Sequence, residues 1–314
     1  MLHQSKLEQL STLGQRQLAL NSRPFMGKIS TLVLQIKWLT GIVLASMLVG
    51  CESFDPVEDP PSFIRIEDFT FNTTPSQGEA SERIEDVWVT VGSEFIGVFP
   101  IPSNVPIIGS GEMNITIAPG IRLNGISAAR LRHPYYTSHT QTLNLIPDSV
   151  LNITPSFSFT DAADFAWVEE FEEFGIKLIS IAESDIERVD DPDIALNGYS
   201  GLLNLQPAEL RFECKSDQKF NLPGSGNAVF LEFDYKGNNP MIVGVFITNP
   251  GEIIQQPVIT LLPSDNWKRI YLNMTDYVSG NPNNLGIEPF FGFIRDEVLE
   301  GDATVYLDNI KLVY

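Results

Sequence analysis

The chain has 314 residues, enough for about two domains of ordinary size. Hydrophobic residues make up 43% of it and charged residues 19%, which is typical of folded globular proteins and excludes wholesale disorder. Its 20 basic and 40 acidic residues give a formal charge of −20, which argues against nucleic-acid binding through a basic face. Two cysteines exclude a disulfide-framed scaffold and any multi-cysteine metal site.

The first fifty residues resemble an export signal. The apolar segment 38–50 (WLTGIVLASMLVG) is too short to cross a bilayer of about 30 Å as a helix, and it has the length of a signal-peptide h-region. It leads into residues 48–51 (LVGC), which resemble the lipobox of bacterial lipoproteins. The resemblance implies cleavage before Cys51, a diacylglycerol on its thiol and an acyl chain on its new amine, which together anchor the protein in a membrane. A short uncleaved anchor with a coincidental cysteine is the alternative.

The two segments that flank this apolar stretch bear on where the chain begins and where it is sent. Residues 1–25 are polar and match an n-region poorly, and a start at Met26 would give a signal peptide of ordinary size. After Cys51, residues 51–62 are acidic and rich in proline, which predicts an extended tether. This tether resembles the acidic export signals of Bacteroidota lipoproteins, which implies an outer-membrane location facing either the periplasm or the medium. A plain solvated tether is the alternative.

Residues 63–156 show the pattern of a small β domain. About seven short segments are predicted as strands, and the region contains no convincing helical stripe. This pattern predicts an immunoglobulin-like sandwich. The clearest predicted strands are 84–91, 95–99, 112–118, 121–126, 142–146 and 150–154.

Residues 157–314 predict a second, longer β domain. Within 229–235, Val, Leu, Phe and Tyr alternate with polar residues, which predicts one buried face and one mostly solvent-exposed face. Residues 241–248 (MIVGVFIT) are nearly all apolar and predict a central strand covered on both sides. Cys214 occupies an apolar position of an alternating segment, after Leu210 and Phe212, and is predicted to be a small core residue. Further strands are predicted at 267–274, 287–294 and 304–313.

Three motifs in this second region resemble a carbohydrate-binding-module jelly roll of the galactose-binding-like group. They are the acidic segment 168–173 (VEEFEE), the segment 198–205 (GYSGLLNL), and the closing pair made by Trp267 and the strand 305–310 (VYLDNI). The resemblance implies a jelly roll. The predicted fold class is therefore all-β, with an N-terminal immunoglobulin-like sandwich followed by a C-terminal jelly-roll sandwich.

Many such jelly rolls hold a structural calcium ion between their first and last strands. The positions that match are Glu170, Glu172 and Asp308. In a strand, Glu170 and Glu172 point to the same face, where two carboxylates repel each other unless a cation lies between them. Ca²⁺ binds six to eight oxygen ligands, so these three residues are candidate ligands for a structural Ca²⁺, and no other cofactor is expected. A solvated acidic face is the alternative.

Two groups of residues are candidates for ligand binding. Sugar-binding sites use aromatic rings surrounded by Asn, Asp and Arg side chains, although large aromatic residues in β domains more often belong to the core. One candidate group falls on a single strand face in the second domain and the other in a loop of the first. They are Trp267, Arg269, Tyr271 and Asn273, and Arg132, Tyr135 and Tyr136.

The sequence contains no Gly-x-Ser-x-Gly nucleophile elbow and no phosphate-binding glycine loop, and we expect no enzymatic activity. We predict a lipid-anchored envelope protein that presents a glycan-binding β-sandwich, with a polysaccharide as its partner. The alternative is a structural or adhesion lipoprotein that contacts other envelope proteins and binds no glycan.

Overall fold

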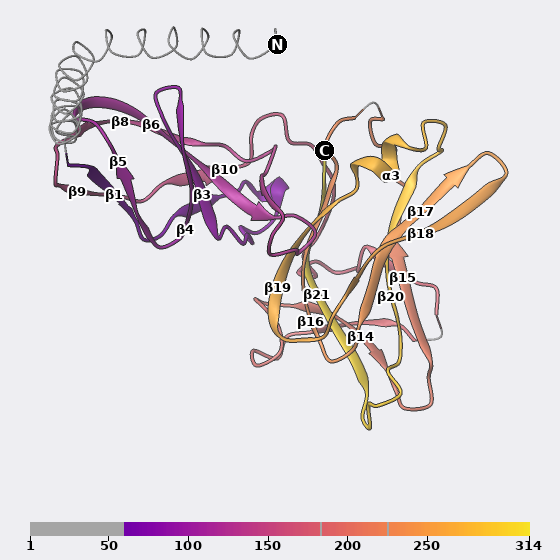
Figure 1. Cartoon of the computed structure of the whole chain (residues 1–314). Helices are drawn as coiled ribbons and strands as arrows, with labels where there is room; N and C mark the ends of the chain where they lie inside the picture. The colour runs from indigo at the N-terminus through magenta and orange to yellow at the C-terminus, as the bar shows by residue number, and fades with distance from the viewer. Residues whose placement is uncertain (1–59, 183, 225) are drawn as a thin grey trace, which may run out of the picture. The chain divides into compact units, whose positions relative to one another are not determined.

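The computed structural model describes residues 60–314 apart from residues 183 and 225, and Pro60–Tyr314 form one compact unit (Figure 1). The predicted signal peptide, Cys51 and most of the tether lie outside the described residues. In the part of the chain that is described, no helix has the length and apolar character needed to cross a membrane.

The first lobe, residues 62–158, is a set of short strands with one 3-10 turn. Its sheets have the orders β5-β1-β9, β4-β3-β6-β7 with β8 also paired to β6, and β10-β2. The pairings of β1 with β9 and of β2 with β10 are parallel, and the others are antiparallel. The elements are β1 (Ser62–Ile66), β2 (Thr70–Asn72), η1 (Pro75–Gln77), β3 (Asp86–Val91), β4 (Glu94–Pro100), β5 (Ser103–Ile107), β6 (Gly111–Arg122), β7 (Arg130–Arg132), β8 (His139–Leu145), β9 (Val150–Ile153) and β10 (Ser156–Ser158).

Alternation of side chains builds the core of this lobe. In β3, for example, Val87 and Val89 are buried while Trp88 and Thr90 are half-buried on the other face. The predicted strand at 121–126 differs from the structure, because β6 ends at Arg122 and the chain then turns through Asn124, whose φ is 53°. This turn matters below, because it contacts the second lobe.

The second lobe, residues 165–313, is a sandwich of two larger sheets. One has the order β13-β14-β21-β16-β19 with β11 also paired to β21, and the other has the order β12-β15-β20-β17-β18. The elements are β11 (Phe165–Glu169), β12 (Leu178–Ser180), β13 (Ile186–Val189), β14 (Ser200–Leu205), β15 (Arg211–Ser216), β16 (Phe230–Gly237), β17 (Met241–Asn249), β18 (Glu252–Leu261), β19 (Ser264–Asn273), α3 (Thr275–Ser279), β20 (Ile287–Ile294) and β21 (Ala303–Val313).

The inward side chains of these two sheets form one continuous hydrophobic core. Phe233, Val243 and Phe291 are fully buried in it, as is Cys214, which confirms the prediction for that residue. The predicted all-β class is confirmed in both lobes, and the two-sheet sandwich of the second lobe agrees with the predicted jelly roll.

The two lobes share part of a core. The hydrophobic cluster of the first lobe also contains Phe230, Tyr271 and Val313 from the second lobe. The prediction of a solvent-exposed face on β16 is therefore wrong, since Glu232 and Asp234 are only 0% and 4% exposed. The first lobe covers that face, and its His133 lies 3.0 Å from Glu232.

Candidate functional site

The outer face of the sheet β12-β15-β20-β17-β18 carries a groove. Along β17, Met241, Val243, Val245 and Ile247 are buried in the core, whereas Phe246 is only half-buried on the opposite face. The prediction that this strand is covered on both sides is therefore wrong, because Ile242 on its outer face lines the groove. The groove has a volume of about 230 Å³. Phe246 lies beside it on the same sheet, in register with Gln255 on one side and Glu288 on the other. The sheet itself is seen in Figure 1.

Two phenylalanine rings lie against each other on this face of the sheet. The ring centroids of Phe246 and Phe290 are 5.1 Å apart. Phe290 stands opposite Gly244 in the neighbouring strand, and a Cβ atom there would lie 2.5 Å from its ring. Glycine at position 244 therefore lets the Phe290 ring lie flat over the sheet. A second glycine, Gly292, leaves the adjacent position on β20 without a side chain.

Charged and amide groups surround this apolar floor, and protein partners hold each of them in place. The Lys215 Nζ atom lies 2.7 Å from Glu288 Oε1, and the ammonium is 5.9 Å from the centre of the Phe246 ring. Arg211 pairs with Glu213, and Glu213 also accepts a hydrogen bond of 3.1 Å from Gln255 Nε2. Arg211 and Gln255 remain exposed.

This arrangement defines what the groove can bind. Aromatic rings offer a flat apolar surface, while fixed polar groups at its edge give direction and selectivity. A ligand with apolar faces and a rim of hydroxyl groups matches both features. The carboxylate of Glu213, in the groove, pairs with Arg211, and that of Glu288, beside the groove, pairs with Lys215.

The four residues predicted on β19 do share one strand face, but that face meets the first lobe. Arg269 and Tyr271 are 6% and 1% exposed, so neither presents its side chain to a large ligand. Trp267 is half-buried, and its Nε1 donates a hydrogen bond of 3.1 Å to the carbonyl of Ile194. Asn273 uses its side-chain oxygen to accept from the amide of Thr275 at 2.9 Å. These side chains serve packing and local structure.

The residues predicted in the loop of the first lobe also face the second lobe. Tyr136 is buried and stacks on His133 with ring centroids 4.1 Å apart. The hydroxyl of Tyr135 donates to the carbonyl of Ala228 at 2.7 Å. Arg132 alone of the three predicted residues remains exposed. The loop therefore joins the lobes, which corrects its assignment as a contact site for an external ligand.

A buried network of charges lies at this junction. Arg269 bonds to Glu232 at 2.9 Å and to Asp234 at 3.2 Å, and His133 approaches the other oxygen of Glu232. Burial alone would raise the pKa of Glu232, but the hydrogen bond and charge of His133, together with Arg269 and Lys311, lower it to about 2. The network is consistent with the rule that buried charges are paired.

The predicted calcium residues do not come together. Strand β11 ends at Glu169, and Phe171 adopts a φ of 59°, so Glu170 and Glu172 do not lie on one strand face as predicted. Glu170 accepts from the amide of Glu79, Glu172 from the amide of Tyr199, and Asp308 from the hydroxyl of Ser200. Among residues 60–314, with 183 and 225 left aside, no three His, Cys, Asp or Glu side chains are grouped to hold a metal ion. The carboxylates already have protein donors and do not fit a calcium site.

Sequence reasoning missed the groove residues. Phe246 and Phe290 each lie inside an apolar run, and this pattern predicts core residues. Gly244, in the middle of the run 241–248, is the signal that could have drawn attention to this strand, because a glycine in a strand interior often marks a close approach.

No protein-family model and no curated protein matches the chain. Solved structures similar to part of it include a xylan-binding domain of carbohydrate-binding-module family 22, with 10% identity, a TM-score of 0.35, and coverage of 49% of this chain and 96% of that one. A family 11 module from Clostridium thermocellum, in complex with a β-1,3-1,4-mixed-linked tetrasaccharide, has 14% identity, a TM-score of 0.35, and coverage of 48% and 94%.

A third similar structure is the enzymatically active domain of tailspike protein 4 from bacteriophage CBA120, with 10% identity and a TM-score of 0.33. The likeness covers 48% of this chain and only 19% of the phage domain. Identities and TM-scores at this level do not transfer a function to this chain.

Proposed function

We propose that this chain is a lipid-anchored protein of the bacterial envelope that binds a glycan in the groove on the outer face of β15, β20, β17 and β18. It acts as a binding protein and not as an enzyme. The proposal combines two independent parts, the groove and the anchor, and each has its own test.

The observation that carries the binding proposal is the pairing of the half-buried Phe246 ring, beside the groove, with fixed polar groups around it. Phe290 packs against this ring and is itself buried. The faces of a pyranose ring are covered by C–H groups, which pack on aromatic rings such as Phe246. Its hydroxyl groups lie around the rim, where Arg211, Lys215 and Gln255 supply donors and Glu288 supplies an acceptor. Because these side chains already hold one another in place, a bound glycan would cost them little conformational entropy.

The test uses the full chain in a nonionic detergent, first on a polysaccharide array and then by calorimetry with the glycan that binds. We expect at least millimolar affinity and a loss of about fivefold or more for Phe246→Ala, since an aromatic contact of this kind is worth about 1 kcal/mol beyond its buried area. Phe174→Ala is the matched control, because the Phe174 side chain is fully exposed and belongs to no strand of this sheet. Gln255→Ala, at an exposed position, tests the rim without altering the floor.

No binding across a broad array, together with an envelope protein recovered by crosslinking, would sink the glycan proposal. That result would favour the alternative of a structural or adhesion lipoprotein that contacts other envelope proteins.

The anchor proposal rests on residues 48–51 and on the acidic tether that follows them. We expect mass spectrometry of the protein from its producing cell to find Cys51 at the N-terminus with a diacylglycerol on its thiol. The membrane contacts the protein through that lipid, at the outer membrane. Cys51 found unmodified and still joined to Gly50 would contradict this.

A further inference from the structure

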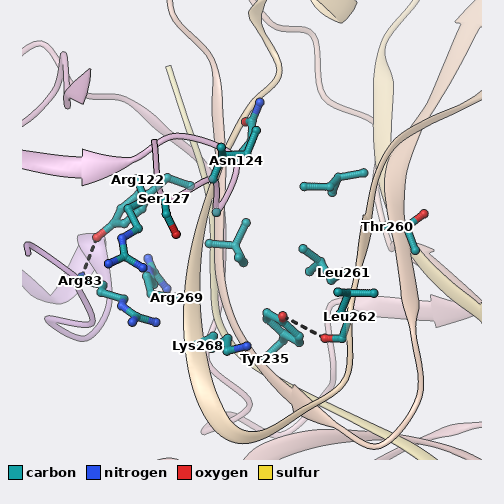
Figure 2. Close-up of a pocket in the computed structure, with 15 residues that line it drawn as sticks. Arg83, Arg122, Asn124, Ser127, Tyr235, Thr260, Leu261, Leu262, Lys268 and Arg269 are labelled. Atoms are coloured by element: carbon teal, nitrogen blue, oxygen red, sulfur yellow. Dashed lines mark hydrogen bonds between the residues drawn. The ribbon is translucent and has the colours of Figure 1, made fainter. Parts of the chain in front are cut away.

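A second cavity, the interlobe pocket, lies between the turn after β6 and the strands β18 and β19. It has a volume of about 410 Å³, within the range of about 300–1,000 Å³ found for small-molecule sites. Four basic residues line it, Arg83, Arg122, Lys268 and Arg269, and no acidic residue does. Figure 2 shows the three arginines on the same side of the pocket, with the hydroxyl of Ser127 beside them. In a chain with twice as many acidic as basic residues, such a lining is unexpected.

The arginines of the first lobe carry more positive charge than their partners neutralise. Glu85 pairs with Arg83 at 2.6 Å and also with Arg122. Arg130 pairs with Asp86 at 2.6 Å and lies 3.6 Å from Glu85. Three guanidinium groups therefore share two carboxylates, which leaves one positive charge without a counter-charge.

Lys268 adds a second uncompensated charge. It is half-buried, and no carboxylate of the described residues lies within 4.0 Å of its ammonium group. The fourth base, Arg269, is neutralised by its two buried carboxylates. The pocket thus favours an anion, and its partly enclosed walls reduce the screening of this charge by solvent.

The basic side chains that a ligand in the pocket can reach are those of Arg83 and Arg122, which are 42% and 32% exposed, and that of the half-buried Lys268. The side chain of Arg269 is 2% exposed and already pairs with its two carboxylates, so it contributes charge and no free donor. A carboxylate supplies two acceptor oxygens in a geometry that matches guanidinium donors.

The opposite wall of the pocket is apolar. Leu261 is the last residue of β18 and Leu262 follows it. The Tyr235 ring lies near them, and its hydroxyl donates a hydrogen bond of 3.2 Å to the Leu262 carbonyl (Figure 2). Ile126, which is 54% exposed, closes the pocket from the first lobe. A ligand for this site therefore needs a carboxylate at one end and an apolar ring face at the other.

We propose that the interlobe pocket binds a hexuronate, a sugar whose C6 is a carboxylate. The carboxylate would sit among Arg83, Arg122 and Lys268, and the C–H face of the ring against Leu261 and Leu262. The anion preference stands on the pocket alone, whereas the choice of a sugar rests on the proposed glycan-binding function. The pocket shares no residue with the groove on the outer sheet, so the two sites can be tested separately.

The test is calorimetry on the full chain in a nonionic detergent, with methyl β-D-glucuronide as the probe and methyl β-D-glucoside as its neutral partner. We expect the glucuronide to bind at least about tenfold more tightly than the glucoside, and its binding to weaken as salt is raised. Lys268→Gln should weaken glucuronide binding about tenfold, and Ser127→Asp, at an exposed position of the turn, should abolish it.

Lys219→Gln is the matched control, because Lys219 is exposed and lies outside the pocket. Phe246→Ala should leave glucuronide binding intact, so that a failure of the groove and a failure of the pocket are distinguishable. Equal binding of glucuronide and glucoside, or no effect of Lys268→Gln in a folded protein, would overturn the proposal. Tighter binding of a tetraglutamate peptide than of the glucuronide would overturn the proposal that the ligand is a sugar. It would indicate an acidic protein segment as the ligand.

Discussion

Arg269 is buried with its guanidinium between Glu232 and Asp234, although its position in the sequence resembles a solvent-exposed strand face. A strand pattern predicts which residues share a face, and the structure agrees with that part. It cannot predict that another lobe covers the polar face, because the covering residues, such as His133, are more than a hundred positions away in the chain. The buried charges of this molecule could therefore not be identified from local pattern alone.

Glu82 is a residue whose ionisation should affect stability. Burial raises the pKa of Glu82 to about 7, against the opposing effect of Arg269 and Lys311, and one of its carboxylate oxygens has no partner among the described residues. In the unfolded chain this group ionises near pH 4.5. Between these pH values the folded state binds the extra proton, so the contribution of Glu82 to the free energy of unfolding falls as pH rises from about 4.5 to about 7.

We expect Glu82→Gln to remove this contribution. The unfolding free energy of the variant should fall less steeply than that of the parent as pH rises through the window, so the difference in stability between variant and parent should shift in favour of the variant. Urea unfolding at a series of pH values measures the slope. Glu187→Gln, at an exposed position of β13, is the control and should leave the slope unchanged. Identical slopes for Glu82→Gln and the parent chain would contradict this account.

At the scale of the elements, β17 shows how a glycine shapes the groove. Its apolar run predicts a strand, which is confirmed, but composition does not reveal that Phe246 lies on an outer face that no other layer of the sandwich covers. For β11 the sequence predicts too long a strand. Glu170 and Glu172 are expected to lie in it, but β11 ends at Glu169. A positive φ at a phenylalanine is uncommon and carries no sequence signal of the kind that glycine gives.

Gly244→Ala tests the fit at this strand. An added Cβ would lie 2.5 Å from the ring of Phe290 and still closer to the carbonyl oxygen of Gln256, so the backbone of β18 or the ring must move. We expect the free energy of unfolding to fall by about 1–3 kcal/mol, measured by urea unfolding. Gly301→Ala is the control, because a Cβ at Gly301 meets no atom within 4 Å and should change stability by less than about 0.5 kcal/mol. Equal stability of the two variants would contradict this expectation, because it would show that the Phe290 ring or β18 moves at little cost in free energy.

At the scale of the whole molecule, the amino-acid pattern predicts the class and most strands well. The second lobe forms the expected two-sheet sandwich because its strands alternate or run apolar over the lengths that such sheets need. The sequence could not predict the junction of the lobes or the interlobe pocket. Residues from the turn after β6 and from β19, which form both, meet only in the folded chain. The candidate groove was missed for the same reason, since its residues come from four strands.

We expect the outer face of β15, β20, β17 and β18 to hold a glycan. A crystal structure of the chain with the polysaccharide fragment that binds on the array tests it most directly. The account predicts a sugar ring stacked over Phe246, with hydroxyl groups hydrogen bonded to Lys215 or Glu288 on one side and to Gln255 on the other. A glycan bound elsewhere on the molecule, with this groove left to solvent, would contradict it.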